Sequence, residues 1–434
     1  MKVVMIGAGY VGLVSGCCFA EFGAEVTCID VDEARIRALA QCRTPIYEPG
    51  LTELLTTNVD SGRLSFSADF SSAVPPADLV FIAVGTPSRR GDGHADLTYV
   101  YEAASEVAKH LSGYTVIVGK STVPVGTARQ VYNVIQEINP EAKFDVASNP
   151  EFLREGAAIS DFMRPDRVVI GAESRQAESL LRELYRPLNL IEAPIVVTDL
   201  ESAELIKYAS NAFLATKVSF INEMSMLCEK VGADIHDVAK GMGLDGRIGK
   251  KFLHPGPGYG GSCFPKDTQA LVKIAQEHHV SSRIVQAVIE VNSAQKARMT
   301  DKIRQALGGT EQGKRIAVLG LTFKPETDDM REAPSLTILP ALIENGAIVC
   351  AHDPQGQEVA ESLLPASVIY HDDIYDAIEG ADAVVLMTEW NQYRGLNLAK
   401  VIDLMDGNVF IDLRNVYERQ QVSDAGFDYY CVGR

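Results

Sequence analysis

One cysteine of the chain lies in a segment whose composition lets other groups come close to the backbone. Residues 256–267 read GPGYGGSCFPKD, so Cys263 follows four glycines and precedes Lys266 and Asp267. A neighbouring cation lowers the pKa of a thiol, and a glycine-rich loop gives a reactant access to it. The pattern indicates a nucleophilic thiol, and the alternative is an inert loop cysteine that packs as a small apolar group.

A second candidate site is the glycine motif GAGYVG at residues 7–12. It lies between an apolar predicted strand and an apolar predicted helix, and Asp30 ends the next predicted strand. In this context Gly7 permits a tight turn, Gly9 admits a pyrophosphate, and Gly12 lets helix and strand pack closely. Asp30 would bond ribose hydroxyls and repel a 2′-phosphate, so the motif favours NAD over NADP. The alternative is a glycine turn in a fold without a nucleotide.

A thiol that works beside NAD suggests a particular chemistry. It adds to an aldehyde to form a thiohemiacetal, which loses hydride to become a thioester, and water then releases an acid. The segment NPEFLREG (149–156) offers Glu151 and Glu155, which share one side if a helix starts there. One carboxylate would direct the water and the other would contact the cofactor. The alternative is a helix start with favourable acids.

The segment ELIKYASNAF adds two donors for a developing oxyanion. Lys207 and Asn211 are four residues apart on one face of a predicted helix. The alternative is a solvated lysine on an amphipathic helix. Lys324 in LTFKP and Arg331 in DDMRE supply further cations, where a phosphate or a cofactor would need them.

Short apolar runs separated by helical stretches predict how these residues are positioned. The runs 2–7, 25–30, 78–87, 115–123, 144–152 and 167–172 predict buried parallel strands. Strands that alternate with helices predict an α/β fold with a doubly wound sheet, which binds ligands at the carboxyl ends of its strands. The loops VGTP (84–87) and STV (121–123) are predicted to lie at those ends.

The remainder of the chain predicts a helical region and a second α/β domain. Residues from about 200 to 300 have helical periodicity, with one long connecting helix, and GGTEQG (308–313) is typical of a linker. The runs 314–323, 347–354 and 381–391 then repeat the opening pattern, although only Gly320 remains of the three glycines, so we expect no dinucleotide there. The predicted domains are an NAD-binding Rossmann domain (1–200), a helical central domain with the cysteine loop (201–305) and a Rossmann-like domain (306–434).

Composition and charge narrow the class of partner. The chain has 434 residues, 46% hydrophobic and 23% charged, and a net charge of −18, which disfavours nucleic acid and anionic membranes. Its eight cysteines show no metal-ligand or disulfide spacing, so we expect no metal and a reducing cytoplasm. The apolar run at the start resembles a signal peptide, but its glycines and Glu21 fit a strand, turn and helix better.

Together these motifs resemble those of the nucleotide-sugar 6-dehydrogenases, over essentially the whole chain. GAGYVGL, VGTP, STVPVGT, NPEFLREG, ELIKYASNAF, GPGYGGSCFPKD and FKPETDDMREAPS occur in the order of that family. The resemblance implies a four-electron, NAD-dependent oxidation of UDP-glucose to UDP-glucuronate through a thioester on Cys263. GDP-mannose and other UDP-sugars are the alternative substrates, and GAAISDFMRPDRVVIG is more similar to the UDP-glucose branch.

The resemblance also implies a role for each matched residue. The expected catalytic residues are Cys263, Thr122, Glu151, Lys207, Asn211 and Asp267. The expected cofactor-binding residues are Gly7, Gly9, Tyr10, Val11, Gly12, Asp30, Arg35, Val84, Gly85, Thr86, Ser121, Thr122, Glu155, Lys266 and Arg331. The expected substrate-binding residues are Glu151, Phe152, Leu153, Arg154, Glu155, Lys207, Asn211, Arg247, Phe252, Leu253, His254, Pro255, Gly256, Gly260, Phe264 and Lys324. A homodimer built on the long helix is implied, in which Arg247 reaches the substrate of the other subunit, and the last domain is expected to bind the uridine diphosphate.

Two other classes of protein fit part of the pattern. A two-electron dehydrogenase of the 3-hydroxyacid type shares the glycine motif and a catalytic lysine, but it needs neither Cys263 nor a third domain. A non-catalytic regulatory module would bind NAD without turnover. The number of NADH molecules released per substrate distinguishes the three classes.

Overall fold

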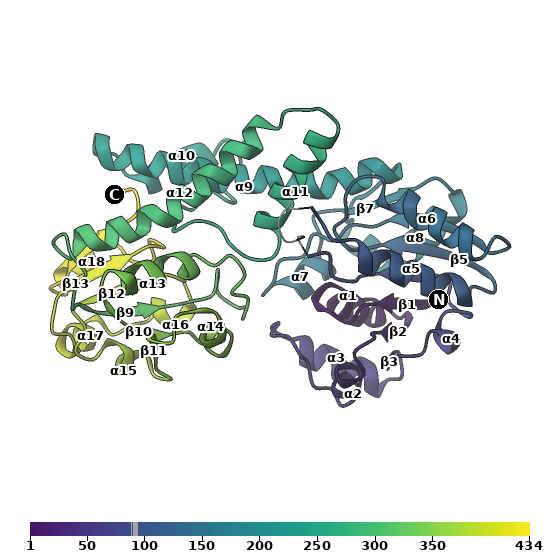
Figure 1. Cartoon of the computed structure of the whole chain (residues 1–434), viewed down its shortest axis with the longest axis horizontal. Helices are drawn as coiled ribbons and strands as arrows, with labels where there is room; N and C mark the ends of the chain where they lie inside the picture. The colour runs from purple at the N-terminus through teal and green to yellow at the C-terminus, as the bar shows by residue number, and fades with distance from the viewer. Residues whose placement is uncertain (88, 90–93) are drawn as a thin grey trace. The chain divides into compact units, whose positions relative to one another are not determined.

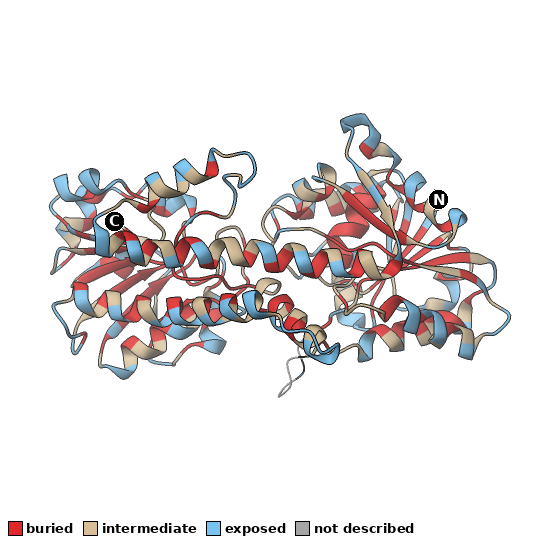
Figure 2. Ribbon diagram, turned by 90° about the horizontal axis from the view of Figure 1, so that it is seen from above, coloured by how far each residue is buried: buried red, intermediate tan, exposed pale blue. Residues whose placement is uncertain are grey.

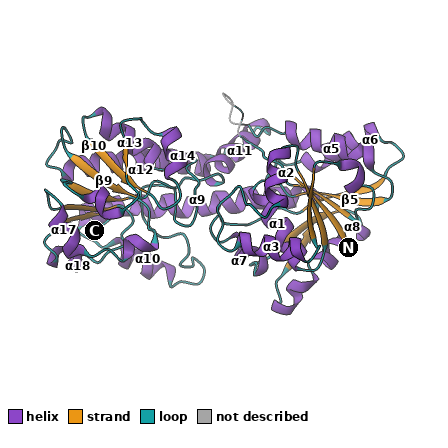
Figure 3. Cartoon of the chain, turned by 90° about the horizontal axis from the view of Figure 1, so that it is seen from below, coloured by secondary structure: helices purple, strands orange, loops and turns teal. Residues whose placement is uncertain are grey.

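A computed structural model describes residues 1–87, 89 and 94–434 of the chain. This part of the chain forms two compact units, Met1–Ser210 with Lys273–His279, and Asn211–Val272 with Val280–Arg434. Each unit contains one sheet with helices on both of its faces (Figures 1 and 3). The units are described separately below.

The first unit is built on an eight-stranded sheet of order β3-β2-β1-β4-β5-β6-β7-β8. Its strands are β1 (Lys2–Ile6), β2 (Glu25–Ile29), β3 (Leu64–Ser67), β4 (Leu79–Ile82), β5 (Tyr114–Gly119), β6 (Lys143–Ser148), β7 (Val168–Ala172) and β8 (Ile195–Thr198). β1 to β6 are mutually parallel, and the order reverses between β1 and β4. The parallel strands and this reversal of order confirm the predicted doubly wound fold. Such sheets bind their ligands at the reversal.

The strand predicted at 167–172 departs from the parallel prediction. β7 pairs with β6 in the antiparallel direction, with Ala147 opposite Ala172, and it pairs in parallel with β8. The connection from β6 consists of a loop (149–157) and the short helix α7 (Ala158–Met163), and it stays at the carboxyl edge of the sheet. An antiparallel neighbour needs no crossover, so the chain turns back along β6. The runs 78–87 and 144–152 also leave their strands earlier than predicted, at Ile82 and Ser148.

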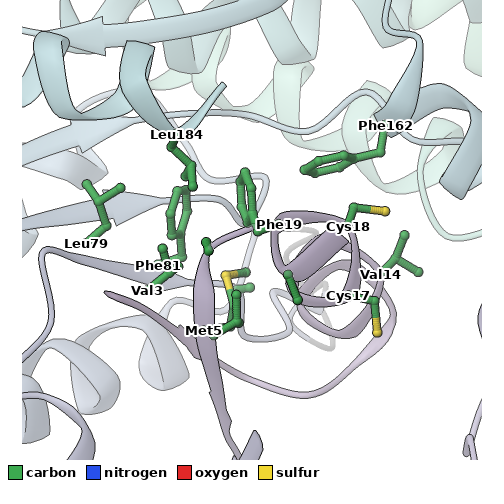
Figure 4. Close-up of a cluster of buried hydrophobic side chains, with 14 of the residues drawn as sticks. Val3, Met5, Val14, Cys17, Cys18, Phe19, Leu79, Phe81, Phe162 and Leu184 are labelled. Carbon is green, nitrogen blue, oxygen red and sulfur yellow. The ribbon is translucent and has the colours of Figure 1, made fainter. Parts of the chain in front are cut away.

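Side chains of the first sheet alternate between two cores. Val3 and Met5 face α1 (Tyr10–Glu21), α3 (Leu51–Asp60), α7 and α8 (Arg175–Leu184), whereas Val4 and Ile6 face α5 (Thr98–His110) and α6 (Thr127–Ile138). Figure 4 shows the first of these cores, where Phe19 of α1 lies beside Phe81 and Phe162. The unit also contains α2 (Glu33–Ala40), α4 (Phe70–Ala73) and a 3₁₀ helix, η1 (Arg186–Ile191).

The sheet of the second unit has the order β11-β10-β9-β12-β13-β14 and is parallel throughout. Its strands are β9 (Arg315–Leu319), β10 (Ile348–His352), β11 (Ile369–Tyr370), β12 (Ala383–Leu386), β13 (Val409–Asp412) and β14 (Asp428–Cys431). One face packs against α12 (Arg283–Ala306), α13 (Ser335–Glu344) and α14 (Gln357–Leu363); the other packs against α15 (Ile374–Ile378), α16 (Asn391–Arg394), α17 (Leu398–Leu404) and α18 (Arg419–Asp424). The strand order repeats that of β1 to β6, so the predicted second Rossmann-like domain is confirmed.

The predicted helical region is also present. It contains α9 (Leu200–Val231), a helix of 32 residues, with α10 (Ile235–Gly243), α11 (Phe264–Glu277) and α12. Figure 2 shows that buried positions along these helices alternate with exposed ones, as amphipathic helices require. Among the residues that the structure describes, no helix is long and apolar enough to span a membrane.

Candidate active site

The glycine turn after β1 has the geometry of a dinucleotide site. A Cβ on Gly7 would lie 2.7 Å from the carbonyl oxygen of Ala83, and one on Gly12 would lie 1.8 Å from the carbonyl oxygen of Gly7. A Cβ on Gly9 would meet no atom within 4 Å, so this position has open space beside it. No side chain caps the N-terminus of α1, which begins at Tyr10. The turn therefore fits a pyrophosphate that accepts hydrogen bonds from the first amides of the helix.

Asp30 is buried at the end of β2, and its carboxylate is held from three sides. It accepts hydrogen bonds from the amide of Ala8 at 2.8 Å, from the amide of Asp32 at 3.0 Å and from Arg35 Nη1 at 2.9 Å. The structure therefore brings Asp30 and Arg35 together beside the glycine turn. A fixed carboxylate next to a guanidinium is suited to choose between a ribose hydroxyl and a 2′-phosphate.

The Asp30→Ala variant is expected to accept NADP much better than the native chain does. Removing the carboxylate ends its repulsion of a 2′-phosphate and frees Arg35 to bind that group. A charge-assisted hydrogen bond of this kind changes the ratio of kcat/KM for NADP to that for NAD by roughly 10- to 100-fold.

Asp30→Asn is the matched variant, because an asparagine oxygen still accepts the amide of Ala8 while the charge is gone. Adding Arg35→Leu to Asp30→Ala is expected to abolish the gain. A cofactor preference that stays unchanged in Asp30→Ala would show that Asp30 does not contact the ribose.

The loops that follow β4 and β5 are joined by side-chain hydrogen bonds. The hydroxyl of Thr86 donates to the carbonyl of Thr122 at 2.9 Å, and the hydroxyl of Ser121 donates to the carbonyl of Val84 at 2.7 Å. The predicted cofactor residues of VGTP, Val84, Gly85 and Thr86, therefore lie beside those of STV. Both loops leave the carboxyl edge of the sheet, as predicted.

The prediction that a helix begins at Glu151 is wrong. Residues 151–157 form a loop, and α7 begins only at Ala158. Glu151 accepts the amide of Leu153 at 2.5 Å, and Gly156 has a φ of +78°. The amides that a helical turn would use are taken by Glu48, which accepts hydrogen bonds from Gly156 at 2.6 Å and from Ala158 at 2.7 Å. Glu151 and Glu155 are therefore not neighbours on a helix.

Glu151 forms a buried ion pair with Lys207 of α9. Their side chains are 6% and 3% exposed, and Lys207 Nζ lies 2.8 Å from Glu151 Oε1. Burial raises the pKa of Glu151, but the charge and hydrogen bond of Lys207 and the amide of Leu153 outweigh this effect, so the pKa lies below its usual value. The ring of Phe152 lies beside the pair, with Lys207 Nζ 5.4 Å from its centroid. A carboxylate and an ammonium group of defined charge thus meet at the edge of the sheet.

Cys263 occupies the position just before α11 in the second unit. The carbonyl of Cys263 accepts the amide of Asp267 at 2.8 Å, the first hydrogen bond of that helix, and the Ser262 hydroxyl lies 3.4 Å from the thiol sulfur. The side chain is half-buried, and the N-terminus of a helix favours a thiolate. Partial exposure and a position at the start of a helix are features of reactive thiols, so the placement is compatible with the predicted role of Cys263.

Asp267 contacts Asn211, another predicted catalytic residue, and Lys266, a predicted cofactor-binding residue. It accepts a hydrogen bond from Asn211 Nδ2 at 2.6 Å and pairs with Lys266 Nζ at 2.9 Å. The Asp267 side chain is almost wholly buried. Its carboxylate therefore fixes the amide of Asn211, and the structure brings Asn211, Lys266 and Asp267 together at the start of α11, next to Cys263.

Polar side chains of α12 hold the backbone of the cysteine loop. Asn292 pairs with Tyr259 through both of its groups, because its oxygen accepts the amide at 2.8 Å and its nitrogen donates to the carbonyl at 3.0 Å. Gln295 donates to the carbonyl of Gly256 at 2.8 Å. The loop is thus fixed several residues before Cys263 by side chains that sequence reasoning did not identify.

The glycines of this loop have neighbours within the protein. A Cβ on Gly260 would lie 2.4 Å from the carbonyl oxygen of Glu332, and one on Gly261 would lie 2.7 Å from the ring of Phe323. The amide of Gly261 donates to the carbonyl of Arg331 at 2.7 Å. Packing against residues 323–332 therefore requires these glycines, whereas the sequence had suggested only close approach to a ligand.

The other predicted residues of the site differ in how they are placed. Arg154 pairs with Asp161, Arg247 with Asp245 and Arg331 with Asp329, each at or near the surface. Lys324 lies over the ring of Phe323, and the rings of Phe252 and Phe264 are 6.0 Å apart. Leu253 and Pro255 are buried, Gly256 lies beside Arg414, and His254 is exposed. Leu253 packs with Ile221, Cys228 and Ile235, so only its backbone is available to a ligand.

In the equivalent turn of the second sheet, a carboxylate of the protein occupies the backbone amides. Gly320 keeps a φ of +95°, but the next amides, of Leu321 and Thr322, donate to Asp353 at 2.6 and 3.1 Å. No helix follows at once, since α13 begins only at Ser335. A carboxylate thus takes amides that a pyrophosphate would need, which supports the expectation that no dinucleotide binds there.

The two units together define a class of protein. One Rossmann domain with an open glycine turn, a second Rossmann-like domain and a helical region with a thiol at a helix start are the parts of a dehydrogenase that works on a nucleotide-bearing substrate. Three family models match the chain: the NAD binding domain, central domain and UDP binding domain of the UDP-glucose/GDP-mannose dehydrogenase family, at residues 1–189, 201–294 and 317–419. The chain belongs to this family, and it is an NAD-dependent oxidoreductase.

Individual relatives agree with this family. The chain is 56% identical to a UDP-glucose 6-dehydrogenase of Rhizobium meliloti, with all of both chains covered. It is 49% identical to the UDP-glucose 6-dehydrogenase TuaD of Bacillus subtilis, covering 100% of this chain and 93% of that one. The structure of a UDP-glucose dehydrogenase from Pyrobaculum islandicum superposes with a TM-score of 0.91 at 41% identity, over 99% and 96% of the two chains. A GDP-mannose dehydrogenase from Pseudomonas aeruginosa gives 0.56 at 31% identity, over 99% of each.

Proposed function

We propose that this protein is a UDP-glucose 6-dehydrogenase, which oxidises UDP-glucose to UDP-glucuronate in two steps at C6. The observation that carries the proposal is the half-buried thiol of Cys263 at the start of α11, because a two-electron dehydrogenase has no use for it. The relatives named UDP-glucose 6-dehydrogenase are more similar to this chain than the GDP-mannose enzyme is. This similarity favours UDP-glucose over GDP-mannose as the substrate.

The residues of the first unit hold the cofactor in this proposal. The turn Gly7–Gly12 and the N-terminus of α1 bind the pyrophosphate, and Asp30 with Arg35 binds the adenosine ribose. Val84 and Thr86 follow β4, where the sheet order reverses, and Ser121 and Thr122 follow the neighbouring strand β5. NAD, when bound, supplies the acceptor for the hydride that each oxidation removes from C6.

The thiol of Cys263 carries the second oxidation. After the first oxidation, the sulfur bonds to C6 of the aldehyde, and its proton goes to the carbonyl oxygen, which gives a thiohemiacetal. Loss of a hydride and of the hydroxyl proton leaves a thioester. Water then adds at C6 and the C–S bond breaks, so the acid leaves and the thiol is restored.

Charged and polar groups stabilise the oxygen at C6 while its charge develops. Lys207 and Asn211 are one turn apart on α9 and are the proposed donors to this oxyanion. Glu151 and Thr122 are proposed to direct the hydrolytic water, and Asp267 orients Asn211 through their 2.6 Å hydrogen bond. The proposed substrate-binding groups are the segments 151–155 and 252–256 with Arg247, Gly260, Phe264 and Lys324.

The test is the number of NADH molecules released per sugar nucleotide at completion, with UDP-glucose and GDP-mannose supplied in limiting amounts in parallel. Two NADH per UDP-glucose and none from GDP-mannose are expected. Two from GDP-mannose would keep the thiol chemistry and overturn the proposed substrate. One NADH per sugar would indicate a simple two-electron dehydrogenase, and binding of NAD without any NADH would indicate a regulatory module.

The predicted three-domain division and the homodimer belong to the same proposal. Residues 1–200 bind NAD, residues 306–434 bind the uridine diphosphate, and residues 201–305 carry the cysteine loop and the dimer contact. Phe213, Phe220 and Leu227 lie seven residues apart along α9 and are 66%, 44% and 54% exposed, so they form an apolar stripe. A second copy of α9 is a partner that buries it. A cytoplasmic location stays a prediction.

Charges placed in this stripe are expected to separate the subunits. Phe213→Asp with Phe220→Asp puts two carboxylates into the apolar centre of the proposed contact, which should raise the dimer dissociation constant by about 100-fold or more. Sedimentation velocity measures the change. Leu190→Asp, at a position that is 90% exposed in the first unit, is the control and should leave the dimer intact. An unchanged dimer in the double variant would place the contact elsewhere.

A further inference from the structure

A lysine that no predicted role includes is buried in the first unit beside the proposed catalytic groups. Lys120 directly follows β5 and is only 3% exposed. Its Nζ donates to Asn149 Oδ1 at 2.9 Å and to the hydroxyl of Tyr185 at 3.1 Å. The rings of Phe19, Phe162 and Tyr185 surround it, with their centroids 5.7 to 6.0 Å from Nζ. Figure 4 shows two of these rings, Phe19 and Phe162, in the core of the first unit.

Lys120 connects two loops that carry proposed catalytic residues. It precedes Ser121 and Thr122 in one loop, and its partner Asn149 lies two residues before Glu151 in the other. The amide of Lys120 donates to Ile82 at the end of β4, and the amide of Asn149 donates to Gly119 at the end of β5. The side-chain bond from Lys120 to Asn149 therefore joins the loops after β5 and β6 at the carboxyl edge of the sheet.

Several ionisable groups lie around Lys120, so its charge affects their protonation. They are Glu151 in the loop after β6, Lys207 on α9, Cys18 on α1 and Tyr185 before η1. Burial lowers the pKa of Lys120 to about 7, Glu151 opposes this shift and Lys207 adds to it. In turn, the charge of Lys120 helps to lower the pKa of Glu151. With Lys120 protonated, the buried group of Glu151, Lys207 and Lys120 has one surplus positive charge.

We propose that Lys120 is a positioning residue for the Glu151–Lys207 pair, which holds the Glu151 loop through Asn149 and keeps Glu151 ionised with a second positive charge. The inference rests on the proposed function, in which Glu151 directs the hydrolytic water. A charged Glu151 accepts a hydrogen bond from that water and orients it, whereas a protonated carboxyl is a weaker base. The surplus charge also favours the oxyanion that forms at C6.

If Lys120 served only to stabilise the fold, its replacement would lower the stability of the protein. The positioning role predicts the opposite result. An ammonium group buried among aromatic rings costs folding free energy, and methionine has a similar length without the charge. Asn149 Oδ1 keeps the hydroxyl of Tyr185 as a donor at 2.7 Å, so Lys120→Met leaves that amide oxygen paired. The folded pKa of Lys120, about 7, lies below its value in the unfolded chain, so this lysine makes stability rise with pH above about 7. In Lys120→Met we expect equal or greater stability at neutral pH and loss of that rise.

The deciding experiment is the pH profile of kcat with UDP-glucose for the native enzyme, Lys120→Met and Tyr185→Phe. In Lys120→Met the acidic limb should move to higher pH, because Glu151 loses a stabilising charge. Its KM for UDP-glucose should stay within about twofold of the native value, since Asn149 is still held by its bonds to the carbonyls of Gly119 and Val169. Tyr185→Phe keeps the ring and the lysine but removes one hydrogen-bonding hydroxyl, so its limb should not move. An unmoved limb in Lys120→Met, or an equal shift in Tyr185→Phe, overturns the proposal.

Two further measurements exclude the remaining outcomes. If Lys120→Met does not fold, Lys120→Gln takes its place, because glutamine is neutral and can still donate to Asn149. The same shift of the acidic limb is expected in this variant. An unmoved limb, or a second failure to fold, overturns the proposal. The native enzyme is titrated in the same assay for NADH per UDP-glucose. A value other than two refutes the proposed function, whereas a value of two with an unmoved limb refutes only the role of Lys120.

Discussion

The Cys263→Ser variant is expected to carry out the first oxidation of UDP-glucose and to stop before the second. A serine hydroxyl has a much higher pKa than a thiol, so the N-terminus of α11 cannot ionise it near neutral pH as it favours a thiolate. Loss of a nucleophile lowers turnover by about 10³-fold or more. The substrate should accumulate at the level of the aldehyde, with one NADH formed per sugar that reacts.

Rapid mixing of the variant with NAD and UDP-glucose measures this outcome through the absorbance of NADH. Cys42→Ser is a suitable control, since Cys42 is also a half-buried free cysteine but lies in the first unit, outside every proposed site. It should behave as the native enzyme does. Two NADH per UDP-glucose at a normal rate from Cys263→Ser would refute the thiol mechanism.

The Lys207→Met variant is expected to lose both activity and stability. Removing a proposed oxyanion donor lowers kcat by about 10²- to 10³-fold. The same change leaves Glu151 buried without the ammonium group 2.8 Å away, and breaking a buried ion pair in this way costs about 3–5 kcal/mol. Because Lys120 still offsets part of the charge of Glu151, we expect a cost near the lower limit of that range.

A double variant separates the two effects of Lys207. Lys207→Met with Glu151→Gln removes both charges, and the amide oxygen of glutamine can still accept the hydrogen bond from Leu153. Denaturant unfolding should show most of the stability restored, whereas kcat should stay low. Recovery of kcat in the double variant would show that neither Lys207 nor Glu151 has the proposed role in the reaction.

Acid should also affect the native pair in a defined direction. Burial raises the pKa of Glu151 in the folded chain, but the charge and hydrogen bond of Lys207, the amide of Leu153 and the charge of Lys120 together bring it below its usual value. The unfolded chain therefore binds the proton more readily. The stability that the pair contributes is present above the ordinary carboxyl pKa of about 4.3 and is lost as the pH falls through the folded value.

Much of the fold follows from patterns that are local in the sequence. Buried strands read as continuous apolar runs, so β1, β2, β4 and β5 and the restart at β9 were predictable, and the order of motifs identified the cofactor. The direction of β7 was not predictable in this way, because it depends on which edge of the sheet the 149–167 connection returns to. The helix expected at Glu151 failed for a related reason: Glu48, about a hundred residues earlier, takes the amides of Gly156 and Ala158.

The residues of the candidate site also differ in how far the sequence predicts them. The groups that are proposed to react, such as Cys263, Lys207 and Asp267, stand in motifs whose residue types indicate that chemistry. Lys120 and Asn292, which hydrogen-bond to neighbouring loops, are polar residues outside the motifs that indicate chemistry, and a sequence alone cannot tell whether such a side chain is solvated or buried. Lys120 had one available signal, its place between a buried strand and the STV loop.

The start of α1 offers anions a local attraction within a strongly acidic protein. The first turn of that helix contains no acidic residue and no capping side chain, although the chain as a whole has a net charge of −18. A helix terminus acts over one turn, whereas the net charge acts over the Debye length, about 8 Å in physiological salt. The net charge of the protein therefore repels an anionic dinucleotide as it approaches, and the N-terminus of α1 attracts it only once it is within about one helical turn. Added salt weakens the repulsion first, so the association rate should rise with ionic strength, the reverse of an electrostatically steered encounter.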